Sequence, residues 1–216
     1  MLLPSFRRPH RALVLGGARS GKSSYAEGLL ARERSVEYVA CGLLPSGEDA
    51  EWGDRVALHR ARRPASWTTT ETVGLAAVLG GSGPPVLVDC LTTWLARVMD
   101  DCGVWAGEAG ADEQLAAAVD DVVDAWTRTR RPVVAVSNEV GSGIVPATPS
   151  GRRFRDELGV LNARVAAASD RVWLVTAGLP QRLRLSAEGD DDALGRAAAG
   201  GVEHRHRRDG VGRLDR

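Results

Sequence analysis

The sequence predicts an α/β domain built on a mostly parallel central sheet. Short apolar runs alternate with longer segments of helical character along most of the chain, and this order is typical of parallel strands joined by helices. Two of the runs, VVAV and VWLV, are apolar throughout, as strands covered on both faces should be. A length of 216 residues with 44% hydrophobic residues is ordinary for one globular domain with a sizeable core.

The first half of the chain holds short apolar runs that end at small or polar residues. These runs predict strands over residues 12–15, 36–40 and 86–88. Helices are expected over residues 22 to about 34, 49–62, 73–79 and 91–101. The first of these helices opens at a glycine-rich turn, Pro64 ends the second, and the run GGSGPP stops the third.

The second half begins with a glycine-rich stretch, 102–111, which we expect to be a loop. A helix over 112–128 follows, because its apolar residues fall on one face: Leu115, Val119, Val122, Val123 and Trp126. A second helix is expected over 150–169, because its apolar residues also fall on one face: Phe154, Leu158, Leu161, Val165 and Ala168. Strands are expected over 132–136 and 171–176.

The two ends of the chain lack this pattern. Residues 1–10 are a polar, proline-containing leader, and the domain is expected to cover 11–185. Residues 186–216 are rich in Gly, Asp, Arg and Ala with little apolar periodicity, so we expect a disordered tail. We expect no metal role for His204 and His206 in that tail, because nothing nearby would hold them rigidly.

The composition excludes several classes of protein. A formal net charge of zero argues against a nucleic-acid binder, which usually carries a basic excess. Cys41, Cys90 and Cys102 have no CxxC spacing, so reduced thiols are expected rather than a zinc site or a disulfide framework. No stretch approaches the roughly 18 apolar residues of a membrane span. The apolar run after the leader is too short for a signal-peptide core, and we expect a cytoplasmic protein.

The clearest chemical signal is a glycine-rich octapeptide that fits G-x-x-x-x-G-K-[ST]: Gly16, Gly17, Ala18, Arg19, Ser20, Gly21, Lys22 and Ser23. Backbone N–H groups of such a loop surround an anion, and the helix after it adds the positive end of its dipole. Lys22 is expected to reach the β- and γ-phosphates of a nucleotide, and the Ser23 hydroxyl to coordinate Mg²⁺. Lys22 is also the only lysine beside 27 arginines, which indicates a position that arginine cannot fill.

The motif turns the general α/β prediction into a P-loop NTPase of the RecA-like class, a three-layer sandwich. Such an enzyme needs a carboxylate at a strand end to hold the metal, and Asp89 closes the run VLVD. The other interpretation of Asp89 is a cap for the helix that begins at Leu91. Asn138 and Glu139 follow a later strand, where they are either substrate contacts or simple turn residues.

His59 lies among arginines in the segment RVALHRARRPASW. A neutral imidazole is a good nucleophile toward phosphorus, and arginines would stabilise a phosphorylated or nucleotidylated product. From the residues alone, a solvated basic helix face is the interpretation that the segment favours.

Several segments together resemble a known family, the bifunctional adenosylcobinamide kinase/adenosylcobinamide-phosphate guanylyltransferases of cobalamin assembly. The segments are LVLGGARSGKSSYAE, RVALHRARRPASWTTTE, VLVDCLTTWLARVM and VAVSNEVGSGIVPATPSGRRFRDELGVLNARVAAASDRVWLVTAGLP. They occur in the family's order over about residues 12–182. The stretch SNEVGSGIVP followed by FRDELGVLNARVA is the most specific part of the resemblance.

The resemblance implies two reactions. ATP or GTP would phosphorylate adenosylcobinamide, and GTP would then donate GMP through a guanylyl-histidine to adenosylcobinamide phosphate, giving adenosylcobinamide-GDP. The histidine would be His59, so the resemblance reverses the interpretation of that residue. It also implies nucleotide contacts at Ala40, Cys41, Gly42, Arg62, Arg63, Pro64, Glu71 and Asp89, with Asp89 serving the metal. Family members assemble as homotrimers, and we carry that expectation over.

Two alternatives to this function stay open on the sequence. One is a monofunctional small-molecule kinase with the same phosphate loop, which would have no use for His59. The other is a non-catalytic RecA-like nucleotide switch, in which Asn138 would sense the γ-phosphate. Labelling of His59 by GTP would distinguish the first from the bifunctional enzyme, and transfer to cobinamide would exclude the second.

Overall fold

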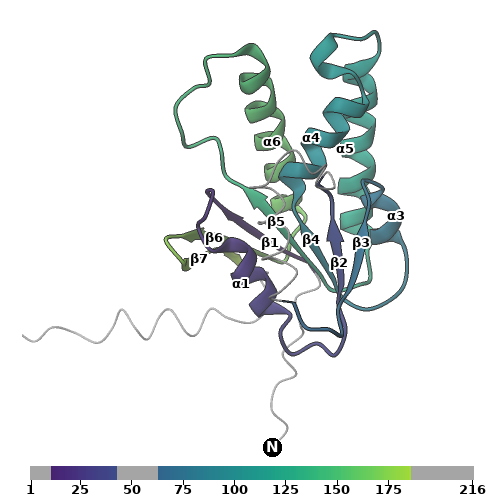
Figure 1. Cartoon of the computed structure of the whole chain (residues 1–216), viewed down its shortest axis with the longest axis vertical. Helices are drawn as coiled ribbons and strands as arrows, with labels where there is room; N and C mark the ends of the chain where they lie inside the picture. The colour runs from purple at the N-terminus through teal and green to yellow at the C-terminus, as the bar shows by residue number, and fades with distance from the viewer. Residues whose placement is uncertain (1–10, 43–62, 186–216) are drawn as a thin grey trace, which may run out of the picture. The chain divides into compact units, whose positions relative to one another are not determined.

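The computed structural model of the chain describes residues 11–42 and 63–185 (Figure 1). The expected leader, the expected helix over 49–62 and the expected tail lie outside the described residues, and so do His59 and Arg62. Among the described helices, none combines the length and the apolar character needed to cross a bilayer.

The central sheet has seven strands in the order β3-β2-β4-β5-β1-β6-β7. Neighbouring strands are parallel from β3 to β6, and only β7 is antiparallel to its neighbour. The strand bounds are β1 (Arg11–Gly16), β2 (Glu37–Ala40), β3 (Thr68–Glu71), β4 (Val86–Asp89), β5 (Val133–Asn138), β6 (Arg171–Thr176) and β7 (Leu179–Leu185).

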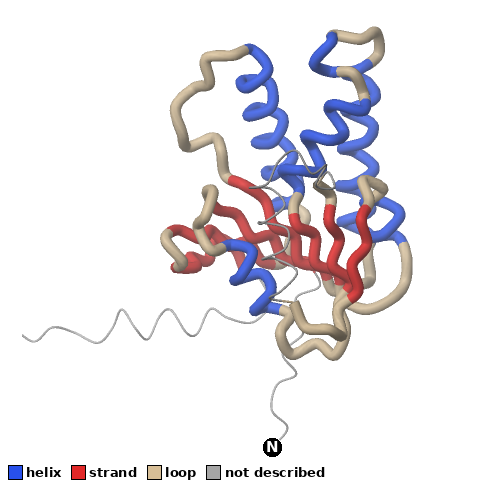
Figure 2. The backbone as a smooth tube through the Cα atoms, in the orientation of Figure 1, coloured by secondary structure: helices blue, strands red, loops and turns tan. Residues whose placement is uncertain are grey.

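Helices cover both faces of the sheet and make three layers (Figure 2). One face packs against α1 (Lys22–Leu29) through a cluster that includes Ala26. The other face packs against α3 (Leu75–Gly80), α4 (Leu91–Asp101), α5 (Ala111–Arg128) and α6 (Pro149–Ala167). A short 3-10 turn, η1 (Val104–Ala106), joins α4 to α5. This arrangement confirms the predicted RecA-like three-layer sandwich with a mostly parallel sheet.

The predicted helices and strands are largely confirmed, with differences at their ends. The first helix was expected to run to about residue 34, but α1 ends at Leu29, because the chain turns there and buries Leu30 in the core. Strand β5 is longer than expected, since its parallel pairing with β1 continues through Ser137 and Asn138. The expected loop over 102–111 contains η1.

Two edge strands were not expected from the sequence. β3 reads TTTE, and its residues are mostly exposed, so no apolar run marks it. β7 reads LPQRLRL and includes Pro180, a residue that sheets accept at their edges. Both strands are held by backbone pairing to a single neighbour, β2 for the first and β6 for the second.

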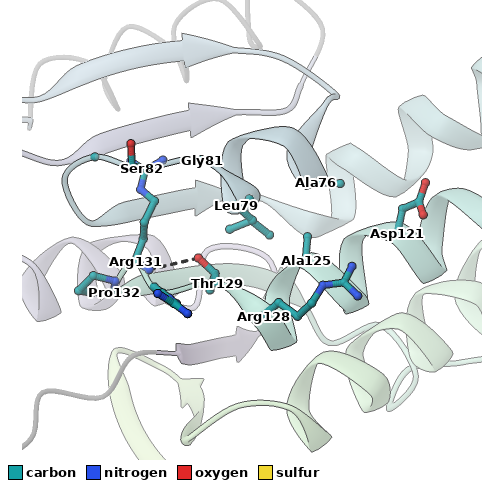
Figure 3. A pocket seen from close by; sticks show the side chains of 13 residues that line it. Ala76, Leu79, Gly81, Ser82, Asp121, Ala125, Arg128, Thr129, Arg131 and Pro132 are labelled. Carbon is teal, nitrogen blue, oxygen red and sulfur yellow. Dashed lines mark hydrogen bonds between the residues drawn. The ribbon is translucent and has the colours of Figure 1, made fainter.

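Near the amino-terminal ends of the strands, Arg131 joins the start of β2 to α3 and to the loop before β4. Its side chain is 5% exposed, and it donates hydrogen bonds to the carbonyls of Pro84 and Val78 and to Oε2 of Glu37, the last at 2.6 Å. The arginine also lines a surface hollow of about 670 Å³ between the loops that precede β4 and β5 (Figure 3). The hollow therefore lies at the opposite edge of the sheet from the phosphate loop, which follows the carboxyl end of β1.

Candidate functional site

The phosphate loop connects the carboxyl end of β1 to the first turn of α1. Its shape depends on glycine at two positions. A Cβ on Gly16 would lie 2.5 Å from Ser20 Oγ and 2.6 Å from the Val175 carbonyl, so only glycine fits. Gly21 has φ +92°, in the left-handed region that favours glycine, and it forms the N-cap of α1. The strand, turn and helix that the motif requires are therefore present.

Lys22 folds back over the loop that precedes it. The residue opens α1 and is 6% exposed, and its Nζ donates a hydrogen bond to the Gly17 carbonyl at 3.0 Å. A buried ammonium next to backbone N–H groups at a helix N-terminus makes an anion-binding environment. The position of the chain's only lysine thus agrees with the role that the motif predicts.

Asp89 lies beside the phosphate loop, at the end of β4, and β5 separates β4 from β1 in the sheet. Ser23 Oγ donates to its Oδ1 at 3.5 Å, and the Tyr38 hydroxyl donates to its Oδ2 at 2.8 Å. Burial, followed by the charge and the hydrogen bond of Asp89, raises the pKa of Tyr38. The tyrosine therefore stays a hydrogen-bond donor at neutral pH.

The alternative role of Asp89 as a helix cap is wrong. The N-cap of α4 is Cys90, which forms a reciprocal capping box with Thr93. Asp89 precedes the cap and directs both of its oxygens to Ser23 and Tyr38 instead. The carboxylate thus belongs to the edge of the sheet, beside the phosphate loop.

Strand register places several predicted residues side by side near this edge, in two rows that are two residues apart. Ala40 pairs with Glu71 on one side and with Asp89 on the other, and Gly16 pairs with Asn138. Parallel strands end at the same edge, where ligands of α/β proteins bind. Residues that are distant in the sequence therefore become neighbours through backbone pairing alone.

Cys41 and Gly42 follow Ala40 at the end of β2. The Cys41 side chain is buried in the core that packs against α4, and burial, with smaller contributions from Cys90 and Asp89, raises the pKa of its thiol. A contact between Cys41 and a nucleotide would therefore have to come from its backbone. The cysteines among the described residues are free thiols, as the sequence predicts.

Arg63 and Pro64 begin the second described segment. The Arg63 guanidinium lies over the Tyr38 ring, 3.6 Å from its centroid, and also donates to Thr69 Oγ1 at 3.0 Å. Pro64 is exposed, and its carbonyl accepts a hydrogen bond from the Trp67 amide. Arg63 is thus brought next to Asp89 through Tyr38, which the sequence does not predict.

Asn138 and Glu139 contact the phosphate loop and its supports through the backbone. The Glu139 amide donates to the Gly16 carbonyl at 3.2 Å, and the Asn138 amide donates to Thr92 Oγ1 at 2.7 Å. Asn162 Nδ2 donates to the Asn138 carbonyl at 3.0 Å. The sequence analysis did not single out Thr92 or Asn162. Each is a polar residue on the buried face of a helix, and this pattern in the sequence could have indicated them.

The donor atoms at this edge suit a magnesium ion carried by a nucleotide. Magnesium prefers oxygen ligands and commonly binds one or two carboxylates together with phosphates and water. Ser23 Oγ and the Asp89 carboxylate are adjacent oxygen donors of that kind. Within residues 11–42 and 63–185, no three His, Cys, Asp or Glu side chains form a metal cluster, so this part of the protein offers no complete protein cage.

Comparison with known proteins extends over nearly the whole described domain. The family model for cobinamide kinase / cobinamide phosphate guanyltransferase matches residues 12–183, from β1 to β7. The chain is 40% identical over 181 residues to the bifunctional adenosylcobalamin biosynthesis protein CobP of Pseudomonas aeruginosa, and the alignment covers 81% of this chain and 97% of that protein. Identity to the bifunctional adenosylcobalamin biosynthesis protein CobU is 36% in both Escherichia coli and Salmonella typhimurium, with 80% of this chain and 98% of each relative covered.

Proposed function

The chain belongs to the cobinamide kinase / cobinamide phosphate guanyltransferase family, and from this premise we propose that it phosphorylates adenosylcobinamide and then guanylylates the product. The observation that carries the proposal is the pairing of Ser23 with Asp89 beside the buried Lys22 ammonium. The family and its bifunctional relatives do not favour the monofunctional kinase or the nucleotide switch that the loop motif alone left open.

In the first reaction, the aminopropanol hydroxyl oxygen of adenosylcobinamide attacks the γ-phosphorus of ATP or GTP. The bond between this phosphorus and the bridging oxygen breaks, ADP or GDP leaves, and the hydroxyl proton passes to solvent or a base. Such a transfer depends on positioning and charge neutralisation rather than on covalent chemistry with the protein. Lys22 and the loop amides supply positive charge to the transferring phosphoryl group.

Mg²⁺ would be held by Ser23 and Asp89 together with the nucleotide. When bound, the ion would offset the negative charge that develops on the phosphates. The contribution of the protein is to keep two oxygen donors at one edge of the sheet, one at the start of α1 and the other at the end of β4. With only one of these two donors, the position of the ion relative to the phosphate loop would not be fixed.

In the second reaction, a His59 ring nitrogen attacks the α-phosphorus of GTP, and pyrophosphate leaves. The phosphate oxygen of adenosylcobinamide phosphate then attacks the same phosphorus, which frees His59 and gives adenosylcobinamide-GDP. Splitting the displacement into two steps is ordinary nucleophilic catalysis. We assign Glu71 to the guanosine or its ribose, and Arg62, Arg63 and Pro64 to the bound nucleotide, as the family resemblance implies.

The test is product analysis by mass spectrometry after incubation with adenosylcobinamide, GTP and Mg²⁺. The native protein should give adenosylcobinamide-GDP. A His59→Asn variant should stop at adenosylcobinamide phosphate and take up no label from α-labelled GTP, because the amide is not a nucleophile. Arg60→Gln, which removes a neighbouring charge but keeps the imidazole, is the control for labelling at His59.

Two outcomes would contradict the proposal. A corrinoid left unaltered by the native protein would remove both activities. Guanylylation that continues in His59→Asn would remove the proposed nucleophile but leave the reactions in place. The homotrimer and the absence of nucleic-acid binding stay predictions.

A further inference from the structure

Four side chains form a continuous path across the carboxyl edge of the sheet. Ser23 Oγ and the Tyr38 hydroxyl each donate to one oxygen of the Asp89 carboxylate, and the Arg63 guanidinium lies on the Tyr38 ring. The path joins α1, β4 and β2 to the segment in which the family resemblance places nucleotide contacts. Tyr38 is its centre, and neither the loop motif nor the family resemblance assigns a role to this residue.

We propose that Tyr38 is a positioning residue that sets the orientation of Asp89 toward the metal and the position of Arg63 toward the nucleotide. The inference rests on the proposed function, since it concerns the metal and the nucleotide that the function requires. Tyr38 contacts neither reactant itself and acts through these two neighbours.

The hydroxyl acts on Asp89. A carboxylate at the end of a strand rotates about its side-chain bonds, and its direction is set by whichever donors it meets. Ser23 holds Oδ1 at 3.5 Å, a long contact, whereas Tyr38 holds Oδ2 at 2.8 Å. Partners of this kind behind a metal ligand typically contribute about 10- to 100-fold to metal affinity or activity. Of these two hydrogen bonds to Asp89, the one from Tyr38 is the shorter, so Tyr38 has the larger influence on the direction of the carboxylate.

The ring acts on Arg63. An arginine over an aromatic face is attracted by the ring quadrupole, and the attraction grows when the pair is shielded from water. The Tyr38 side chain is 4% exposed, and its ring centroid lies 3.6 Å from the guanidinium carbon. The same rigid ring thus fixes the start of the 63–71 segment, at whose end lies Glu71, the proposed guanosine contact.

The experiment uses Tyr38→Phe, which removes the hydroxyl and keeps the ring. Mn²⁺ binding to the complex with GTP is measured by electron paramagnetic resonance, and GTP binding is measured separately in EDTA. We expect about 10- to 100-fold weaker Mn²⁺ binding and unchanged metal-free GTP affinity. The matched control is Tyr25→Phe. Tyr25 is the only other tyrosine in the sequence; it lies on α1, and its ring packs against Trp173 of β6 with the centroids 5.3 Å apart. That control should bind Mn²⁺ like the native protein.

Two further variants test the mechanism behind the effect. On an Asp89→Asn background, Tyr38→Phe should add less than about twofold to the loss, because residues that act through one shared contact are not additive. Tyr38→Leu, which also removes the ring, should weaken GTP binding in EDTA, whereas Tyr38→Phe should not.

The outcomes separate this inference from the function on which it rests. Native Mn²⁺ affinity in Tyr38→Phe, or an independent loss on the Asp89→Asn background, would overturn the role of Tyr38 while both reactions of the native protein remain. Absence of metal-dependent transfer in the native protein would instead remove the proposed function itself.

Discussion

At the scale of single residues, the composition and the structure both single out Lys22. The chain uses arginine for every other basic side chain outside histidine, and the ammonium of its one lysine contacts the phosphate loop. An ammonium is compact and directs three donors freely, whereas a guanidinium is a planar fork. The Lys22 ammonium lies 3.0 Å from the Gly17 carbonyl oxygen, and the small ammonium group suits this confined position better than a guanidinium would.

Replacement of Lys22 by alanine should weaken GTP binding about 10- to 100-fold, because a charge-assisted hydrogen bond contributes about 1.5–3 kcal/mol. Lys22→Arg should not restore the affinity, since the fork does not fit the loop. Equilibrium titration with a fluorescent GTP analogue measures both variants. Arg19→Gln, which removes an exposed charge from the same loop, is the comparison for a general electrostatic effect. Native affinity in Lys22→Ala would contradict the assignment of the loop.

Residues whose role depends on a hydrogen bond to a distant part of the chain could not be predicted from the sequence. Tyr38, Thr92 and Asn162 are polar groups within apolar strands or helix faces, and each bonds to a residue more than twenty positions away. Spacing along the chain reports local structure only, so it does not identify partners on other elements. Asp89 was predictable because its place at the end of an apolar run is itself a local feature.

At the scale of elements, the phosphate loop depends on the turn between β6 and β7. The Gly178 amide donates to the Ser20 carbonyl at 2.8 Å, and the Val175 carbonyl oxygen lies 2.6 Å from the position that a Cβ on Gly16 would take. Ala177 and Gly178 both have positive φ, 51° and 81°, so this turn has a specific shape. The loop is therefore supported from outside the motif, by residues about 160 positions later.

Gly16→Ala should lower the free energy of unfolding by about 1–3 kcal/mol, because the added methyl group meets Ser20 and a backbone carbonyl. Gly17→Ala is the matched control, since a Cβ there has nothing within 4 Å. Its effect on stability should be within about 1 kcal/mol. Urea unfolding of the nucleotide-free protein measures both. Equal stability of the two variants would show that the loop can shift away from β6.

Edge strands mark the limit of prediction for elements. Internal strands are apolar because both faces are covered, and this makes them visible in the sequence. Within the described sheet, β3 and β7 each pair with one strand only, and they carry Thr, Arg and Gln rather than an apolar run. Their positions matter for the site, because β3 ends at Glu71 and β7 follows the turn that supports the loop.

At the scale of the whole molecule, the two edges of the sheet have different roles. The carboxyl edge carries the phosphate loop and Asp89, while the amino edge is held by Arg131 and Glu37. Burial raises the pKa of Glu37, but hydrogen bonds from Arg131 and Thr70 and the charge of Arg131 together lower it below its ordinary value. The ion pair joins β2 to Arg131, two residues before β5, and thereby links strands on either side of β4.

This pKa shift predicts how stability depends on acid. The unfolded chain binds a proton at Glu37 near the ordinary value of 4.5, whereas the folded protein binds it only at lower pH. The contribution of Glu37 is therefore complete above that value and is lost as pH falls through the lower, folded value. Glu37→Gln should show a smaller loss of stability between about pH 5 and pH 3 than the native protein.

Urea midpoints measured at several pH values in that range test this prediction. Asp121→Asn, which removes one acidic group from an exposed position on α5, controls for the change in net charge. An identical pH slope in the native protein and Glu37→Gln would show that the Arg131 pair does not contribute to acid sensitivity.

The sequence by itself determined the fold class, the phosphate-loop motif with its lysine, the position of Asp89 at a strand end and the family, because each is written in contiguous residues. Apolar runs, a glycine-rich octapeptide and long matching segments can all be recognised without knowing which residues they contact. Tertiary structure decided which residues stand beside these groups: Tyr38 at Asp89, Arg63 on Tyr38, the β6–β7 turn under the loop and Arg131 at the far edge. Those contacts join distant parts of the chain, and only the pairing of strands and the packing of helices brings them within hydrogen-bonding distance.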